Sequence, residues 1–412
     1  PMTITTNLFF LIVFMTTCPT ITQSFFHQQH QLRPFDMSLK LPLSSRNNQN
    51  NPASVDNTDE DTMTATSTCE QSTLTLLEHI NLNVPNQDHV LSFYIRILGF
   101  GLDPRKASNL ISNNRGTLWA NCGASQIHLP YGETAQVIPG AIGLRYATLD
   151  GLRQRLEEYD HQKEQSQQDD DSLSCISDYE WGEDKSGRPY LRIKDRYGNV
   201  IYCRAEEHEN IPSSFRRQVS LQSQWKQPLV STTDDDKFGD IAIQYGKVES
   251  ECLGIDYVEF SCPKGSATKI AQFYDSIFDA TTSVLEDKGN GVAIVAFGTI
   301  DPQQGRADQY LLFREVTDNS VLQPYDGHHI ALYVGQSSLD FEVAFQNCNL
   351  AGIVWVNPRF TDKAVDLQSA NKWHQFRFKD ILDIATGEVI MELEHEVRSV
   401  SHESYLGSQL SI

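Results

Sequence analysis

The sequence predicts an α+β fold built from four βαβββ modules in two tandem pairs. One observation is the order of its apolar segments, because a strand, a helix and further strands recur four times between residues 74 and 398. The other is a nearly constant offset between the halves: Pro85 and Pro263 are 178 residues apart, and Tyr94 and Tyr274 are 180 apart. A loop absorbs the two-residue difference, so the offset indicates an internal duplication.

The first half, residues 74–208, contains two predicted modules. Its opening strand alternates His79 and Asn81 with apolar residues, and the helix after it ends at Gly99, a residue typical of helix C-termini. A Gln- and Asp-rich stretch over 161–171 predicts a surface loop. The expected helices are 90–98 and 149–159, and the expected strands are 76–84, 116–121, 125–129, 141–146, 179–181, 190–193 and 200–203.

The second half, residues 252–398, repeats the pattern. Helices are expected around 273–274 and over 341–348, and strands over 255–260, 292–297, 309–313, 329–334, 373–378 and 389–393. His329 enters one of these apolar strands, and Glu392 lies inside another. Burying either group bare costs several kcal/mol, so each must be hydrogen-bonded, ion-paired or bound to a metal. For His329 taken alone, a histidine satisfied within the core is the simpler alternative.

The composition excludes several classes of partner. A formal charge of -21 disfavours DNA, RNA and anionic membrane surfaces, which attract basic faces. Eight scattered cysteines without a CxxC pair argue against a zinc ribbon or a thioredoxin motif and suit reduced, buried thiols, with a few disulfides of a secreted protein as the alternative. No internal stretch is long enough to span a membrane. We expect a small-molecule substrate, no nucleic acid, and no membrane association of the mature form.

Four segments are expected to lie outside the modules. Residues 8–15 form an apolar run of signal-peptide length, so residues 1–24 are interpreted as a signal peptide. Residues 25–72 begin in a Gln-, Ser- and Asn-rich stretch and end in a polar linker. Together these two segments resemble the two-part presequence of algae with secondary plastids, which implies delivery to a plastid through the secretory pathway; plain secretion is the alternative. Residues 209–251 form an acidic connector, and residues 399–412 a C-terminal tail.

Several motifs resemble the vicinal oxygen chelate superfamily, which includes glyoxalase I, extradiol dioxygenases, and fosfomycin and bleomycin resistance proteins. The resemblance covers residues 74–208 and 252–398. The stretches that carry it are Glu78–Val84, Phe93–Phe100, Asp195–Asn199, Gly327–Val334 and Ile390–Leu393. It implies two tandem glyoxalase-like domains whose modules pair into curved sheets, each cupping one metal.

In this superfamily the ligands come from the first and last strands of each paired module. Laid onto this chain, the four modules offer His79 and His128, Ala141 and Tyr202, Tyr257 and Leu311, and His329 and Glu392. Pairing neighbouring modules would leave each cup two conventional ligands. Monomeric glyoxalases that arose by duplication instead pair module 1 with 4 and module 2 with 3. That arrangement would gather His79, His128, His329 and Glu392 in one cup and leave the other without a metal-binding set.

Three histidines and a carboxylate suit one divalent ion of zinc, iron, nickel, cobalt or manganese. The resemblance then implies a glyoxalase-like lyase or isomerase for a small substrate with vicinal oxygens, with the metal as Lewis acid and Glu392 as base. His128 departs from the pattern, since glyoxalase I usually has a second glutamate there. Two alternatives stay open: an extradiol-type iron dioxygenase using His79, His329 and Glu392, and a non-enzymatic small-molecule-binding protein.

Overall fold

The computed structural model describes residues 70–103, 106, 109, 116–165, 174–206, 250–287, 289–301, 305–335 and 337–405. All of them belong to one compact unit. The predicted signal peptide, nearly all of the segment 25–72, nearly all of the acidic connector and residues 406–412 lie outside the described residues. No helix in the described part is long and apolar enough to cross a membrane.

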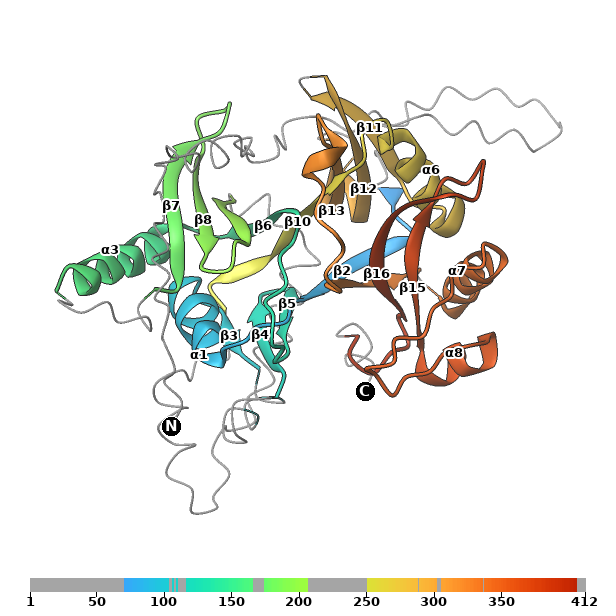
Figure 1. Cartoon of the computed structure of the whole chain (residues 1–412), viewed down its shortest axis with the longest axis horizontal. Coiled ribbons are helices and arrows are strands. Elements are labelled where there is room, and N and C mark those ends of the chain that lie inside the picture. Colours follow the sequence, from blue (N-terminus) through green and yellow to red (C-terminus); the bar gives the residue numbers. More distant parts are fainter. Residues whose placement is uncertain are drawn as a thin grey trace, which may run out of the picture. The chain divides into compact units, whose positions relative to one another are not determined.

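The described strands form two sheets (Figure 1), and each sheet combines modules from both halves of the sequence. The seven-stranded sheet has the order β15-β16-β14-β2-β5-β4-β3. Its strands are β2 (Leu74–Asn81), β3 (Gly101–Leu102), β4 (Leu118–Cys122) and β5 (Ser125–Leu129) of module 1, and β14 (His329–Val334), β15 (Gln375–Leu382) and β16 (Val389–Ser399) of module 4. The prediction that module 1 pairs with module 4 is therefore confirmed.

The nine-stranded sheet pairs module 2 with module 3, also as predicted. Its order is β1-β12-β13-β10-β6-β9-β8-β7, with β11 paired to β12. Its strands are β1 (Glu70–Gln71), β6 (Gly140–Tyr146), β7 (Ile176–Glu183), β8 (Pro189–Asp195), β9 (Val200–Ala205), β10 (Cys252–Cys262), β11 (Thr282–Asp287), β12 (Asn290–Asp301) and β13 (Arg306–Glu315). The segment of β1 was predicted to belong to a polar linker, and β11 was not predicted.

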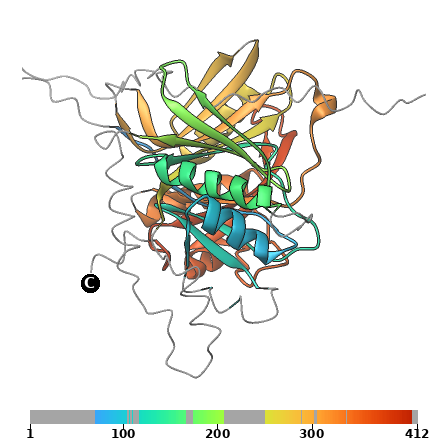
Figure 2. The same cartoon turned by 90° about the vertical axis from the view of Figure 1, so that its left-hand side faces the viewer.

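Helices cover the outer faces of the sheets. They are α1 (Gln87–His89), the π-helix η1 (Val90–Ile97), α3 (Asp150–Gln165), α6 (Ala267–Phe278), the 3-10 helix η4 (Asn319–Val321), α7 (Ser338–Leu350) and α8 (Leu367–Trp373). Figure 2 shows α3 alongside η1, where Arg155 Nε donates to the carbonyl of Ile97 at 2.8 Å. The predicted loop over 161–171 is wrong as far as Gln165, because α3 continues through residues that favour helix.

One buried glutamine side chain forms hydrogen bonds to both sheets. Gln309 of β13 accepts a hydrogen bond from the amide of Leu77 at 2.9 Å and donates to the Leu77 carbonyl at 3.0 Å. It also donates to the carbonyl of Ile255 at 2.9 Å. Its side-chain amide thus satisfies backbone groups of β2 and β10 at once.

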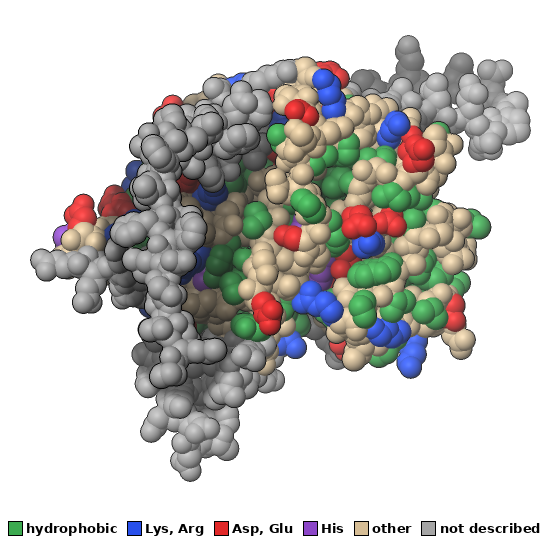
Figure 3. All heavy atoms as spheres, in the orientation of Figure 1, with side chains coloured by type: hydrophobic (Ala, Val, Ile, Leu, Met, Phe, Trp, Pro, Cys, Tyr) green, Lys and Arg blue, Asp and Glu red, His purple; other side chains and the backbone are tan. Residues whose placement is uncertain are grey.

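The described surface in Figure 3 carries acidic and basic side chains in alternation with apolar ones. The acidic side chains visible on the described part of that face are not gathered into a single patch.

Candidate metal centre

Two histidines from opposite halves of the chain lie side by side at the centre of the seven-stranded sheet. β2 and β14 run antiparallel, with Ala331 opposite His79. Because side chains alternate along a strand, Ile80 and Ile330 point into the core beneath the helices, and both imidazoles share the other, inner face. The ring centroids of His79 and His329 are 5.8 Å apart, and both side chains are buried.

A carboxylate, that of Glu396 on β16, lies beside the two imidazoles. Glu396 is opposite Ala331 across the parallel β14–β16 ladder. Glu396 Oε2 is 3.7 Å from His329 Nε2 and 4.0 Å from His79 Nε2. One donor atom from each residue lies within 4.8 Å of the other two, and we call the three residues the His–His–Glu cluster. All three are at most 3% exposed, so the cluster is shielded from bulk water.

The predicted ligand Glu392 lies outside this cluster. Its side chain is 45% exposed and accepts a hydrogen bond from Lys379 Nζ at 2.9 Å. The prediction ended the strand at Leu393 because polar residues follow it, but β16 continues to Ser399. Arginines pair with the carboxylates in that continuation, so the sheet can bury them. The carboxylate that joins the two histidines is therefore Glu396, four residues further along.

His128 lies beside the cluster. Its ring stacks on His79, with centroids 3.8 Å apart, and on Trp119 from the other side, with centroids 4.4 Å apart. In the strand ladders His128 lies opposite Asn81, which is two residues after His79. In the same way Glu396 lies opposite Ala331, which is two residues after His329. His128 and Glu396 therefore occupy equivalent places in modules 1 and 4.

Two buried arginines hold the carboxylate of Glu396. Arg398 Nε donates to Oε1 at 2.6 Å, and Arg377 Nη2 donates to Oε2. Burial acts to raise the pKa of Glu396, but the two guanidinium groups and the neighbouring imidazoles hold that pKa well below its usual range. Glu396 is therefore a carboxylate anion at neutral pH.

Two of the imidazoles are neutral at the same pH. Burial lowers the pKa of His329 well below its ordinary value, and the charge of Arg377 acts in the same direction. Burial and the neighbouring His79 likewise lower the pKa of His128. A neutral imidazole keeps one nitrogen lone pair, which is the form that binds a metal ion.

Two nitrogens of the cluster are buried without a hydrogen-bond partner among the described residues, His79 Nε2 and His329 Nδ1. His79 Nδ1 lies 2.8 Å from Glu78 Oε2, and His79 Nε2 faces the anionic Oε2 of Glu396 at 4.0 Å. A cation bound between these two atoms would give the buried nitrogen a partner.

The donor set fits a divalent metal ion. Two imidazole nitrogens and one carboxylate oxygen are ligands of zinc and of iron, nickel, cobalt and manganese. Ligand atoms around a tetrahedral ion with bonds of about 2.0–2.1 Å lie roughly 3.3 Å apart. The separations of 3.7 and 4.0 Å from Glu396 Oε2 would need only small side-chain adjustments to reach that value.

The second predicted cup, on the inner face of the nine-stranded sheet, holds no comparable set of donors among the described residues. Ala141, Tyr202 and Tyr257 lie together there in a buried apolar cluster. Leu311 does not lie there, because it packs into the main core on the opposite face and Leu312 points into the cup in its place. A shift of one residue moves a strand side chain to the other face.

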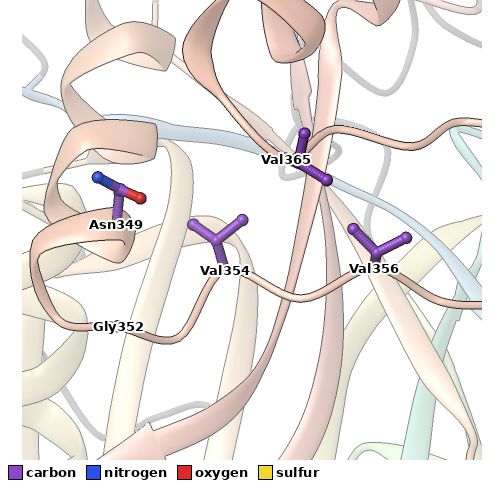
Figure 4. Close-up of a pocket in the computed structure, with 5 residues that line it drawn as sticks. All are labelled: Asn349, Gly352, Val354, Val356 and Val365. Carbon is purple, nitrogen blue, oxygen red and sulfur yellow. The ribbon is translucent and has the colours of Figure 1, made fainter.

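A surface pocket of about 210 Å³ lies at the end of α7 (Figure 4). It is lined by Asn349, Gly352, Val354, Val356 and Val365. None of these residues is charged, and none belongs to the His–His–Glu cluster. The pocket therefore offers no group for acid–base or metal chemistry.

No family model and no curated protein matches the chain. Solved structures similar to it over about four fifths of its length or over one module pair belong to the glyoxalase, bleomycin resistance and dioxygenase superfamily. A glyoxalase I variant from Zea mays is 10% identical, with 82% of this chain and 96% of that chain covered and a TM-score of 0.44. A lactoylglutathione lyase from Agrobacterium tumefaciens is 15% identical, with 32% and 92% covered and a TM-score of 0.22. A superfamily member from Sphaerobacter thermophilus is 15% identical, with 32% and 98% covered and a TM-score of 0.23.

Proposed function

We propose that His79, His329 and Glu396 bind one divalent metal ion, and that the chain is a glyoxalase-like lyase or isomerase for a small substrate with two neighbouring oxygens. The observation that carries this proposal is the buried convergence of His79 Nε2 and His329 Nε2 on Glu396 Oε2, at 4.0 and 3.7 Å, with no hydrogen-bond partner for His79 Nε2 among the described residues. The bound ion would supply Lewis-acid chemistry to the substrate oxygens.

The residues around the cluster would keep the ligands in place. Glu78 holds the Nδ1–H of His79, which orients the ring and presents Nε2 to the ion. Arg398 holds Oε1 of Glu396 and so directs the other oxygen toward the histidines. Because the arginines lower the pKa of Glu396, this carboxylate is a ligand and a weak base.

His128, whose pKa is also lowered, is a second candidate for proton transfer because of its position. Its Nε2 lies 3.0 Å from the amide oxygen of Gln126, and the tautomer that donates there leaves the lone pair on Nδ1. The ring is neutral and stacks against the ligand His79, so it lies next to the proposed ion. His128 would thus accept a proton from a substrate carbon beside the coordinated oxygens.

The ligand set itself favours a second candidate, an iron(II) dioxygenase of the extradiol type. Two histidines and one carboxylate with further coordination positions are the pattern of non-haem iron oxygenases. The identity of the metal separates the two functions. Iron, together with oxygen consumption in the presence of a catechol, would favour the dioxygenase; zinc, nickel, cobalt or manganese would favour the lyase or isomerase.

Metal content measured by elemental analysis, on protein purified without chelators or metal-affinity resin, tests the site. We expect about one ion per chain in the wild type, and its loss in His329→Ala and Glu396→Gln. Glu392→Gln is the matched control, because it removes a carboxylate from the same strand and should keep the ion. A folded wild type without metal would leave a non-enzymatic binding protein as the better account, and metal retained by Glu396→Gln would contradict the assigned ligand set.

A further inference from the structure

Arg377 contacts the oxygen of Glu396 that the proposed metal ion would use. It lies on β15 directly opposite Glu396, is 4% exposed, and donates from Nη2 to Oε2. The same oxygen faces His329 Nε2 and His79 Nε2. The guanidinium of Arg377 and the ion would therefore both bind to Glu396 Oε2.

The other contacts of Arg377 keep its guanidinium next to the cluster whether or not Nη2 bonds to Glu396. Nη1 donates to Glu394 Oε1 at 2.9 Å, and Nε donates to Asp362 Oδ2 at 3.1 Å. The guanidinium carbon lies 4.2 Å from the centroid of the Phe360 ring. Arg377 can thus give up one hydrogen bond and remain held by two carboxylates and an aromatic ring.

Arg398 differs from Arg377 in the oxygen that it binds. It donates to Oε1, on the side of the carboxylate away from the shared oxygen, and also donates to Glu78, which orients His79. The carboxylate would therefore keep its orientation if Arg377 were removed. Arg377 then contributes chiefly a positive charge and a competing donor at Oε2.

We propose that Arg377 is a positioning residue that competes with the metal ion for Glu396 Oε2 and so limits metal affinity. This inference rests on the proposed metal site. On binding, Oε2 would exchange the Nη2 hydrogen bond for the ion, while Arg377 keeps its bonds to Glu394 and Asp362. Loading of the site would thus release only the hydrogen bond between Arg377 and Glu396.

Removing Arg377 should change metal affinity in the opposite direction from removing a residue that orients a metal ligand. Loss of such a partner commonly weakens metal binding ten- to a hundredfold, because the ligand loses its orientation. Here the orientation is supplied by Arg398, and a unit positive charge within a few ångströms of a dication is repulsive in a buried site. Removing Arg377 should therefore strengthen metal binding by at least about tenfold.

The dissociation constant for Zn²⁺, measured by competition with a chromogenic chelator, tests the proposal, with circular dichroism to confirm folding. The variants are Arg377→Gln and the double variant Arg377→Gln with Glu394→Gln. The double variant leaves the net charge of the site unchanged. It also leaves no unpaired carboxylate at position 394, so it should fold where the single variant does not. The matched control is Arg314→Gln, which removes a comparable arginine paired with Glu259 in the other sheet.

Competition predicts tighter Zn²⁺ binding in both Arg377 variants and an unchanged constant in the control. The gain should be smaller in the double variant, where Oε2 loses the competing donor but the net charge of the site stays the same. Unchanged or weaker binding in the folded double variant, with normal binding by the wild type, would overturn the role of Arg377 and leave the metal site standing. Zn²⁺ binding in the Arg377 variants alone would support the competition strongly. Absence of binding in every variant would overturn this inference together with the proposed function.

Discussion

The buried carboxylate of Asp256 lies between two arginines, and we predict that Asp256→Asn destabilises the fold in a pH-dependent way. Asp256 is 1% exposed. Its Oδ1 accepts a hydrogen bond from Arg145 Nε at 2.6 Å, and its Oδ2 accepts one from Arg204 Nη2 at 2.8 Å. Burial raises the pKa of Asp256, but the two arginines outweigh it and lower the pKa from 3.8 to about 2.

The size of the effect follows from this pKa. At 1.36 kcal/mol per pH unit, a fall from 3.8 to about 2 contributes roughly 2 kcal/mol of folding free energy at neutral pH. Because the folded-state pKa is the lower one, the contribution is complete above about pH 4 and is lost as the pH falls toward 2. Asparagine also weakens the compensation of two buried guanidinium charges, which brings the expected cost at pH 7 to about 3–5 kcal/mol.

Urea unfolding of the wild type and Asp256→Asn at pH 7 and pH 3 measures both quantities. The difference in unfolding free energy between the two proteins should shrink by about 1 kcal/mol at pH 3, where roughly half of the contribution of Asp256 is lost. Asp178→Asn is the control, since Asp178 pairs with Arg192 but is 55% exposed and should matter by less than about 1 kcal/mol. A difference that is small at pH 7, or equal at both pH values, would refute the reasoning.

Three further predictions concern stability. Gln309→Leu should lower the unfolding free energy by about 2–4 kcal/mol in urea titrations, because the amide of Leu77 loses its buried acceptor and the carbonyls of Leu77 and Ile255 each lose a donor; a loss below 1 kcal/mol would contradict it. Gly143→Ala should cost about 1–3 kcal/mol in the same assay, since the new Cβ would lie 2.2 Å from the ring of Tyr257; unchanged stability would show that the ring moves freely. A divalent ion at 100 times its dissociation constant should stabilise the wild type by about 2.7 kcal/mol and leave Glu396→Gln unchanged in thermal unfolding; equal stabilisation of both would place the ion elsewhere.

The repeated modules and the two central histidines were predictable from the sequence, because both depend on patterns that repeat. His79 and His329 each interrupt an apolar strand that precedes a helix, and a histidine in such a strand needs a partner. The cross-paired arrangement followed from the resemblance, since only that arrangement brought several metal ligands into one cup. The sheet order confirms the arrangement.

The carboxylate of the cluster was not predictable in the same way. Glu394 and Glu396 follow Leu393 with hardly an apolar residue between them, which is how a strand commonly ends. Their burial depends on Arg377, which comes from the neighbouring strand, and sequence spacing does not show that contact. Period-two alternation of Glu394, Glu396 and Arg398 was the available signal. The prediction that Leu311 lines the second cup was wrong for another reason. Consecutive apolar residues do not show which one points inward.

The cross-pairing of modules also delays the assembly of the seven-stranded sheet during translation. His79 and His329 are 250 residues apart, and the edge of β2 that faces away from β5 has no partner until β14 has been synthesised. At roughly 5–20 residues per second on the ribosome, this interval lasts on the order of 10–50 s. Throughout that time β2 presents an unpaired strand edge and a face destined for burial, the kind of surface that promotes aggregation. A nascent chain of this design therefore depends, for the length of its own translation, on whatever shields that edge.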